Sequence, residues 1–119
     1  MCGDEMSNRR AVRNGKRAES LVLEAFDTEL CNDPADIWIN DRPYEIKSCQ
    51  EKVKKCSGRF WIEPLQHQFL LRNRGYYIFI VFGSQDQPKF SKIVRADRVT
   101  GPIDKPVTIT WKRVFRGGD

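Results

Sequence analysis

Histidine is nearly absent from this sequence, and its scarcity limits the chemistry open to the chain. His67 is the only one, so neither a catalytic triad nor a Cys/His zinc site is expected. Cys2, Cys31, Cys49 and Cys56 form no Cys-x-x-Cys pair, and we interpret them as small buried or incidental residues. Carboxylates, lysines and arginines are therefore the side chains from which a functional site would be built.

Long apolar stretches are missing as well. No run of about 18 apolar residues occurs, so we expect no membrane-spanning helix. The N-terminus lacks the pattern of a signal peptide, which predicts a cytoplasmic location. Reducing conditions there disfavour disulfide bonds, although the cysteine spacing alone leaves them open.

Acidic residues are outnumbered by basic ones. The 119 residues include 21 Lys and Arg against 16 Asp and Glu, which gives a net charge of +5 and a pI of about 9.2. The excess lies in residues 61–119, with 10 basic and 5 acidic residues, whereas residues 1–60 contain 11 of each. A basic envelope around a local acidic cluster favours a polyanionic partner such as nucleic acid. The length predicts a single domain at residues 9–116, with tails at 1–8 and 117–119.

Hydrophobic periodicity predicts the order of the secondary structure. One helix is expected from Arg10 or Gly15 to Glu29, and a second over residues 60–75. Strands are expected at residues 37–39, 44–48, 76–82, 90–95 and 107–112, with a short turn or helix at 96–99. The first two strands flank a turn signal and form a hairpin, and the very apolar third strand is expected to be buried on both faces. This order predicts an α/β fold with a mixed central β-sheet flanked by α-helices.

The hairpin carries two carboxylates and a lysine. Asp36 stands at the start of its first strand, and Glu45 and Lys47 lie in its second strand. Because strand side chains alternate, Glu45 and Lys47 share one face while Ile46 points to the other. Two carboxylates suit Mg²⁺ or Mn²⁺, and the carbonyl of Ile46 is available as a further ligand. Such an ion would activate a phosphodiester and a water, while Lys47 would hold or deprotonate that water or stabilise the transition state.

Two basic segments are candidates for contact with a nucleic acid backbone. The first opens the N-terminal helix, and the second is the connector at residues 50–59. The alternatives are a solvated helix face and a solubilising loop; we favour phosphate contact for the helix, whereas the connector fits both interpretations equally. The candidate contacts are Arg10, Arg13, Lys16, Arg17, Lys54, Lys55 and Arg59.

Three polar helix residues have simpler interpretations. Glu19, taken alone, is a solvated residue that pairs with a neighbouring cation. His67 is a surface or hydrogen-bonding residue rather than a metal ligand, because a single histidine supports no cluster. Gln66 is a polar position of the second helix, and the alternative is that it orients a water or touches a substrate.

The hairpin residues resemble the motif of the PD-(D/E)XK nuclease superfamily. Asp36 matches the motif aspartate, and Glu45-Ile46-Lys47 matches the Glu-x-Lys element on the following strand. The pattern departs at one point, because Ala35 separates Pro34 from Asp36. The resemblance implies a restriction-endonuclease-like fold, a metal held by Asp36, Glu45 and the carbonyl of Ile46, and catalysis by the carboxylates with Lys47.

The N-terminal segment is similar to a narrower family. Gly15-Lys16-Arg17-Ala18-Glu19 resembles the Gly-x-x-Ala-Glu-Arg start of archaeal Holliday junction resolvases, with Ser20 in place of the arginine. The resemblance runs through residues 10–82 and implies that Glu19 joins the metal site as a catalytic carboxylate. It also implies a Mg²⁺-dependent DNA endonuclease that acts as a homodimer on branched DNA.

Two other functions stay open. A restriction-type or repair endonuclease of the same superfamily would share the metal site and differ in how it recognises DNA. A non-catalytic DNA-binding subunit would have the same fold without the catalytic activity. Such a subunit would have no physical reason to hold three carboxylates near one another.

Overall fold

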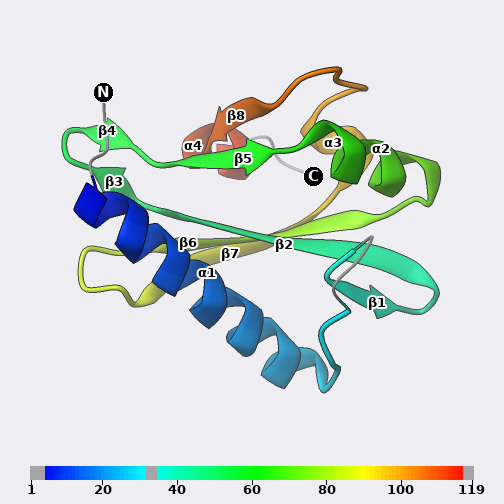
Figure 1. Cartoon of the computed structure of the whole chain (residues 1–119), viewed down its shortest axis with the longest axis horizontal. Coiled ribbons are helices and arrows are strands. Elements are labelled where there is room, and N and C mark those ends of the chain that lie inside the picture. Colours follow the sequence, from blue (N-terminus) through cyan, green and yellow to red (C-terminus); the bar gives the residue numbers. More distant parts are fainter. Residues whose placement is uncertain (1–4, 32–34, 117–119) are drawn as a thin grey trace.

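The computed structural model describes residues 5–31 and 35–116 of the chain (Figure 1). The helices are α1 (Glu5–Phe26), α2 (Pro64–Arg72), α3 (Ala96–Val99) and α4 (Trp111–Arg116). The strands are β1 (Ile37–Ile39), β2 (Arg42–Gln50), β3 (Lys52–Val53), β4 (Cys56–Ser57), β5 (Arg59–Ile62), β6 (Tyr76–Phe82), β7 (Pro88–Arg95) and β8 (Val107–Thr110). None of the helices in the described ranges has the length and apolar character needed to cross a bilayer.

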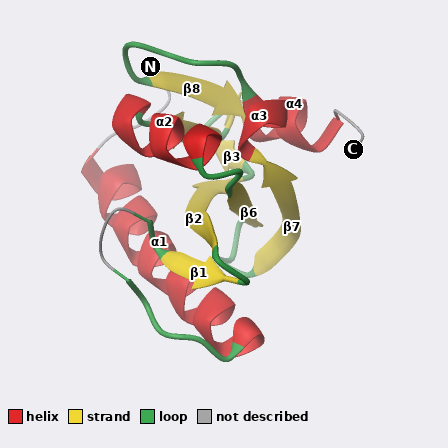
Figure 2. Ribbon diagram, turned by 90° about the vertical axis from the view of Figure 1, so that its right-hand side faces the viewer, coloured by secondary structure: helices red, strands yellow, loops and turns green. Residues whose placement is uncertain are grey.

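The central sheet is mixed. Its strands lie in the order β1-β2-β6-β7. β2 and β6 are parallel, whereas the β1–β2 and β6–β7 pairs are antiparallel. α1 covers one face, and α2, α3, α4 and the β5–β8 pair cover the other (Figures 1 and 2). The predicted mixed sheet flanked by helices is therefore confirmed.

The core lies on both sides of β6, because its side chains alternate between the two faces. Ile78 packs with Ala18 and Val22 of α1, and all three are buried. Phe79 points the other way and packs against Phe60 of β5 in a tilted arrangement, with ring centroids 4.4 Å apart. A strand whose two faces are both covered must be apolar throughout, which explains the uninterrupted run of apolar residues in β6.

A two-residue turn joins β1 to β2. Asn40 and Asp41 both have positive φ, at 51° and 64°. Left-handed geometry at both central positions defines a type I′ turn, whose twist suits a hairpin, and Asn and Asp tolerate it well. The turn sets the register that places Ile37 opposite Tyr44, so the predicted hairpin is confirmed.

The limits of α1 differ from the prediction. The helix begins at Glu5, inside the segment predicted as a tail, and ends at Phe26 rather than Glu29. Asp27 follows with φ at 50°, and the next amide donates to the carbonyl of Leu23 at 3.1 Å. This left-handed cap satisfies the last carbonyls and stops the helix.

Two other segments were predicted wrongly. Residues 60–62, included in the predicted second helix, belong to β5 because Phe60 and Ile62 are buried in alternation and the strand pairs with β8. Residues 111 and 112, predicted as the end of a strand, instead begin α4. Trp111 anchors this helix, since its indole Nε1 donates to the carbonyl of Glu51 at 2.8 Å. Whether these residues form a strand or a helix depends on contacts with residues far away in the sequence, and hydrophobic periodicity carries no information about such contacts.

The described cysteines differ in exposure and in bonding state. Cys31 is exposed and Cys49 half-buried, and both are free thiols. Burial raises the pKa of the Cys49 thiol to about 12, so this thiol stays protonated at neutral pH. Cys56 is exposed and disulfide-bonded, so its interpretation as a small buried or incidental residue is wrong. Cys2 lies outside the described residues.

Candidate active site

The carboxylates and the lysine of the hairpin meet on one face of the sheet. Glu45 and Lys47 lie on the same face of β2, with Lys47 Nζ 3.9 Å from Glu45 Oε2. Ile46 points to the opposite face and packs in the cluster under α1. The alternation predicted for these three residues is therefore observed.

Asp36 reaches the site from the segment before β1. Its Oδ2 accepts a hydrogen bond of 2.8 Å from the backbone amide of Ile46, which fixes the carboxylate beside β2. Burial raises the pKa of Asp36 above its ordinary value, while the Ile46 amide and the charge of Lys47 partly offset this effect. The hydrogen bond uses one oxygen of the carboxylate and leaves the other available to a ligand.

Glu45 is the most strongly perturbed acid of the site. The residue is 4% exposed. Burial, followed by the negative charge of Asp36, raises its pKa to about 7, and the cation of Lys47 partly offsets the rise. A buried carboxylate next to another carboxylate is stabilised by any cation that reaches both.

Gln66 of α2 holds the lysine. Lys47 Nζ donates to Gln66 Oε1 at 3.1 Å, so the ammonium lies between Glu45 and the amide oxygen. The start of α2 fixes Gln66, because the carboxylate of Glu63 caps the helix and accepts the backbone amide of Gln66 at 3.0 Å. Neither of the two roles considered for Gln66 from the sequence, a polar helix position or a contact with water or substrate, included a bond to Lys47.

Glu19 lies at the edge of the same group. It is half-buried and follows Ala18, which points into the core beneath α1. Burial and then the charge of Asp36 raise the pKa of Glu19, while Lys16 lowers it. The charge of Glu19 in turn contributes to the raised pKa of Glu45. Electrostatically, the three carboxylates form one group.

A sequence profile of the PD-(D/E)XK nuclease superfamily domain matches residues 5–116. The chain belongs to the PD-(D/E)XK nuclease superfamily. Proteins of this superfamily are generally metal-dependent nucleases, so nuclease activity on DNA is supported in general for this PD-(D/E)XK domain. No curated protein and no solved structure matches the chain significantly.

The donor set of this PD-(D/E)XK domain fits a hard divalent cation. Within residues 5–31 and 35–116, no three His, Cys, Asp or Glu side chains converge tightly enough to form a complete ligand cage. Mg²⁺ does not require one, because it retains several waters and is commonly held by one or two carboxylates. Asp36 and Glu45 supply these, and a cation between them would offset the burial and the charge of Asp36, which together raise the pKa of Glu45.

Removal of the amide that holds Lys47 has a predictable effect. We expect Gln66→Ala to lower the rate of DNA cleavage about tenfold, because the ammonium loses a fixed position but keeps its charge. Single-turnover cleavage rates of Gln66→Ala and of Gln68→Ala, whose side chain is exposed on the same helix, provide the comparison. Equal rates for the two variants would show that Gln66 does not position the lysine.

The cations of α1 are less available to DNA than the sequence suggested. Arg10 and Arg13 form ion pairs with Asp86 in the β6–β7 turn, the latter at 2.7 Å. Arg17 donates to the backbone carbonyl of Asp86 and lies over the ring of Phe82. These three arginines join α1 to the turn, which is an alternative that the sequence did not suggest.

The contacts between the arginines of α1 and Asp86 are expected to contribute to the stability of the fold. We predict that Asp86→Asn, which keeps a residue that tolerates φ of 57°, lowers the free energy of unfolding by about 1 kcal/mol. Urea unfolding at low and high salt measures the effect, which should shrink as salt screens the ion pairs. Asp104→Asn, an exposed substitution of the same charge, is the control. If Asp86→Asn lowers the free energy of unfolding no more than the control does, the contacts of Asp86 with α1 have no structural role.

The remaining basic candidates lie on the surface. Lys16, Lys54, Lys55 and Arg59 are exposed, and Lys54 occupies the turn of the β3–β4 hairpin with φ of 58°. Arg59 approaches Thr108 Oγ1 at 3.5 Å from the neighbouring strand. The connector thus contains a small hairpin rather than a loop alone, and its candidate cations are exposed.

His67 is buried beneath the site rather than on the surface. Its Nε2 faces the carbonyls of Thr100 and Gly101 at 3.0 and 3.1 Å, which can only accept, so Nε2 carries a proton. In the neutral ring, Nδ1 then accepts from the hydroxyl of Tyr77 at 2.8 Å. The prediction of a hydrogen-bonding residue is confirmed, and the surface alternative is wrong. His67 anchors α2, which carries Gln66.

Proposed function

We propose that this PD-(D/E)XK domain is a Mg²⁺-dependent DNA endonuclease that hydrolyses phosphodiester bonds. The observation that carries the proposal is the pair of carboxylates, Asp36 and Glu45, with the ammonium of Lys47 held 3.9 Å from Glu45. Two acids with raised pKa values beside a fixed cation are unfavourable for folding alone. They suit a site that assembles around a divalent cation and a phosphate.

Each residue has a proposed role. Asp36 and Glu45 hold the cation, with the carbonyl of Ile46 as a further ligand and Glu19 as a carboxylate that orients water at its edge. When bound, Mg²⁺ would polarise the phosphodiester and lower the pKa of a bound water. Lys47 orients the attacking water and stabilises the negative charge that develops on the phosphate.

The substrate proposed first is branched DNA. The segment from Gly15 to Glu19 supports this choice through its similarity to Holliday junction resolvases, and a homodimer would place two sites for paired cuts. A cytoplasmic location is part of the same proposal. A restriction-type or repair endonuclease is the second candidate, and a non-catalytic DNA-binding subunit the third.

A panel of labelled DNA substrates separates these candidates. A four-way junction, a linear duplex, a single strand and a plasmid are incubated with the protein in Mg²⁺, while the oligomeric state is measured by light scattering. Paired nicks near the crossover by a dimer would support the resolvase. Cuts at one duplex sequence would favour the second candidate, and binding without cleavage in Mg²⁺ or Mn²⁺ would favour the third.

A further inference from the structure

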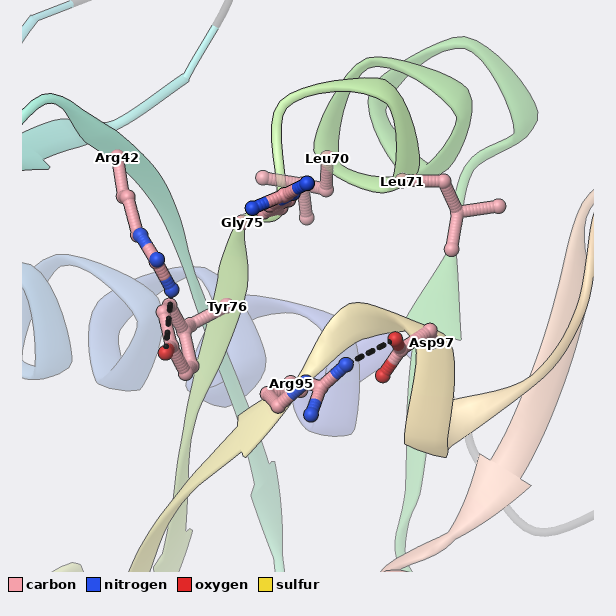
Figure 3. Close-up of a pocket in the computed structure, with 8 residues that line it drawn as sticks. Arg42, Leu70, Leu71, Gly75, Tyr76, Arg95 and Asp97 are labelled. Atoms are coloured by element: carbon pink, nitrogen blue, oxygen red, sulfur yellow. Dashed lines mark hydrogen bonds and ion pairs between the residues drawn. The ribbon is translucent and has the colours of Figure 1, made fainter.

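A basic pocket lies at one end of the central sheet, where β6 begins and β7 ends (Figure 3). Its volume is about 330 Å³. The lining comprises Arg42, Leu70, Leu71, Arg74, Gly75, Tyr76, Arg95 and Asp97. Three guanidinium groups against one carboxylate make it an electropositive cavity that none of the metal-site residues lines.

Most of the guanidinium N–H groups around the pocket have no protein acceptor. Arg42 donates to the hydroxyl of Tyr76 at 3.0 Å, and Arg95 pairs with Asp97 at 2.6 Å. Arg74 makes no hydrogen bond or ion pair with any residue in the described parts of the chain. Each guanidinium has five N–H donors, so several remain for a ligand that offers several acceptor oxygens.

The chain holds Arg74 in place at a conformational cost. Arg74 follows the last turn of α2 with φ of 53°, a position at which glycine is usual. Gly75 comes next, and an added Cβ there would lie 2.7 Å from the carbonyl of Pro43. The close contact at Gly75 and the left-handed arginine before it place Arg74 in the lining of the pocket.

We propose that this pocket binds a phosphate group of nucleic acid, at a point separate from the metal site. Arginine forks match the geometry of phosphate oxygens, and three of them suit a negatively charged group with several acceptor oxygens. Arg42 starts the same strand that carries Glu45, about 10 Å further along at the usual rise per residue. A DNA strand with a phosphate at Glu45 and Lys47 has other phosphates within that distance. The source is either an in-chain phosphodiester or a terminal phosphate.

Only the identity of the phosphate-bearing ligand rests on the proposed nuclease function. The pocket itself is tested with inorganic phosphate, titrated into ¹⁵N-labelled protein while the amide shifts of Gly75 and Tyr76 are followed. We expect saturable binding that Arg74→Gly weakens about tenfold, the factor for one charge-assisted hydrogen-bonded pair. Arg74→Gly should not lower the melting temperature, because glycine favours the positive φ found there. Arg42→Gln should weaken phosphate binding as well.

Arg72→Gln is the matched control, since this exposed arginine of α2 lines a different cavity. Binding of short duplexes with and without a 5′-phosphate, measured in EDTA, then identifies the source. If Arg74→Gly loses more affinity for the duplex with the 5′-phosphate, the pocket binds a terminal phosphate. If the variant loses the same affinity for both duplexes, the pocket binds an in-chain phosphodiester.

Equal affinities of Arg74→Gly and Arg72→Gln for phosphate and for both duplexes would overturn the inference. Phosphate binding through Arg74 by a protein that cuts no DNA would refute the nuclease while leaving the phosphate pocket standing.

Discussion

Replacement of Lys47 by alanine is expected to lower the single-turnover rate of DNA cleavage about 10³-fold. The ammonium is fixed by Gln66 and lies 3.9 Å from Glu45, so its loss removes the positive charge beside this buried carboxylate. Affinity for DNA should change little, because one cation among the 21 Lys and Arg contributes modestly to backbone binding.

The control for this experiment is Lys52→Ala. Lys52 is exposed on β3 and is not among the residues of the site, and its replacement by alanine removes the same charge. We expect wild-type cleavage by Lys52→Ala. A Lys47→Ala variant that folds, binds DNA and cuts it within a few-fold of the wild-type rate would show that the lysine has no catalytic role.

The second large effect concerns Glu45 and the pH dependence of stability. Because burial and then Asp36 raise the pKa of Glu45 from 4.5 to about 7, the folded state binds a proton more tightly than the unfolded state. The metal-free protein should therefore be most stable, with respect to this group, below about pH 4.5. Its free energy of unfolding should fall by about 3 kcal/mol as the pH rises to about 7, where ionisation must be forced on the folded state.

Glu45→Gln should remove this dependence of the free energy of unfolding on pH. A neutral amide of similar shape does not ionise, so we expect the variant to be more stable than the wild type at pH 8 in EDTA. Urea unfolding at several pH values measures the difference, with Glu24→Gln, an exposed position on α1, as the control. Parallel pH profiles for wild type and Glu45→Gln would mean that Glu45 titrates normally in the fold.

Local patterns were sufficient for the hairpin and the central strand. The Asn-Asp turn, the alternation of Glu45, Ile46 and Lys47, and the apolar run of β6 each carry their signal within a few residues. The same local information identified Asp36 and Glu45, on the two arms of the hairpin, as candidate carboxylates of one site. Their coupling in space follows because Asp36 and Ile46, separated by the hairpin turn, are joined by a hydrogen bond.

Features that depend on distant partners were beyond a local pattern. The bond between Lys47 and Gln66 links β2 to α2, and the arginines of α1 meet Asp86 more than 60 residues away along the chain. The strand conformation of residues 59–62 depends on pairing with β8, and α4 depends on Trp111 packing against Phe90. None of these contacts leaves a periodic signal in either partner alone.

The binding of Mg²⁺ tests the central claim most directly. Calorimetric titration of the protein at pH 7, in two buffers of different ionisation enthalpy, measures both affinity and proton release. We predict binding that releases a fraction of a proton, because a cation favours the ionised form of Glu45. Asp36→Asn should lose this binding, whereas the exposed Asp104→Asn should retain it. Binding that is the same in wild type and Asp36→Asn, or absent from both at saturating Mg²⁺, would contradict a metal site at these carboxylates.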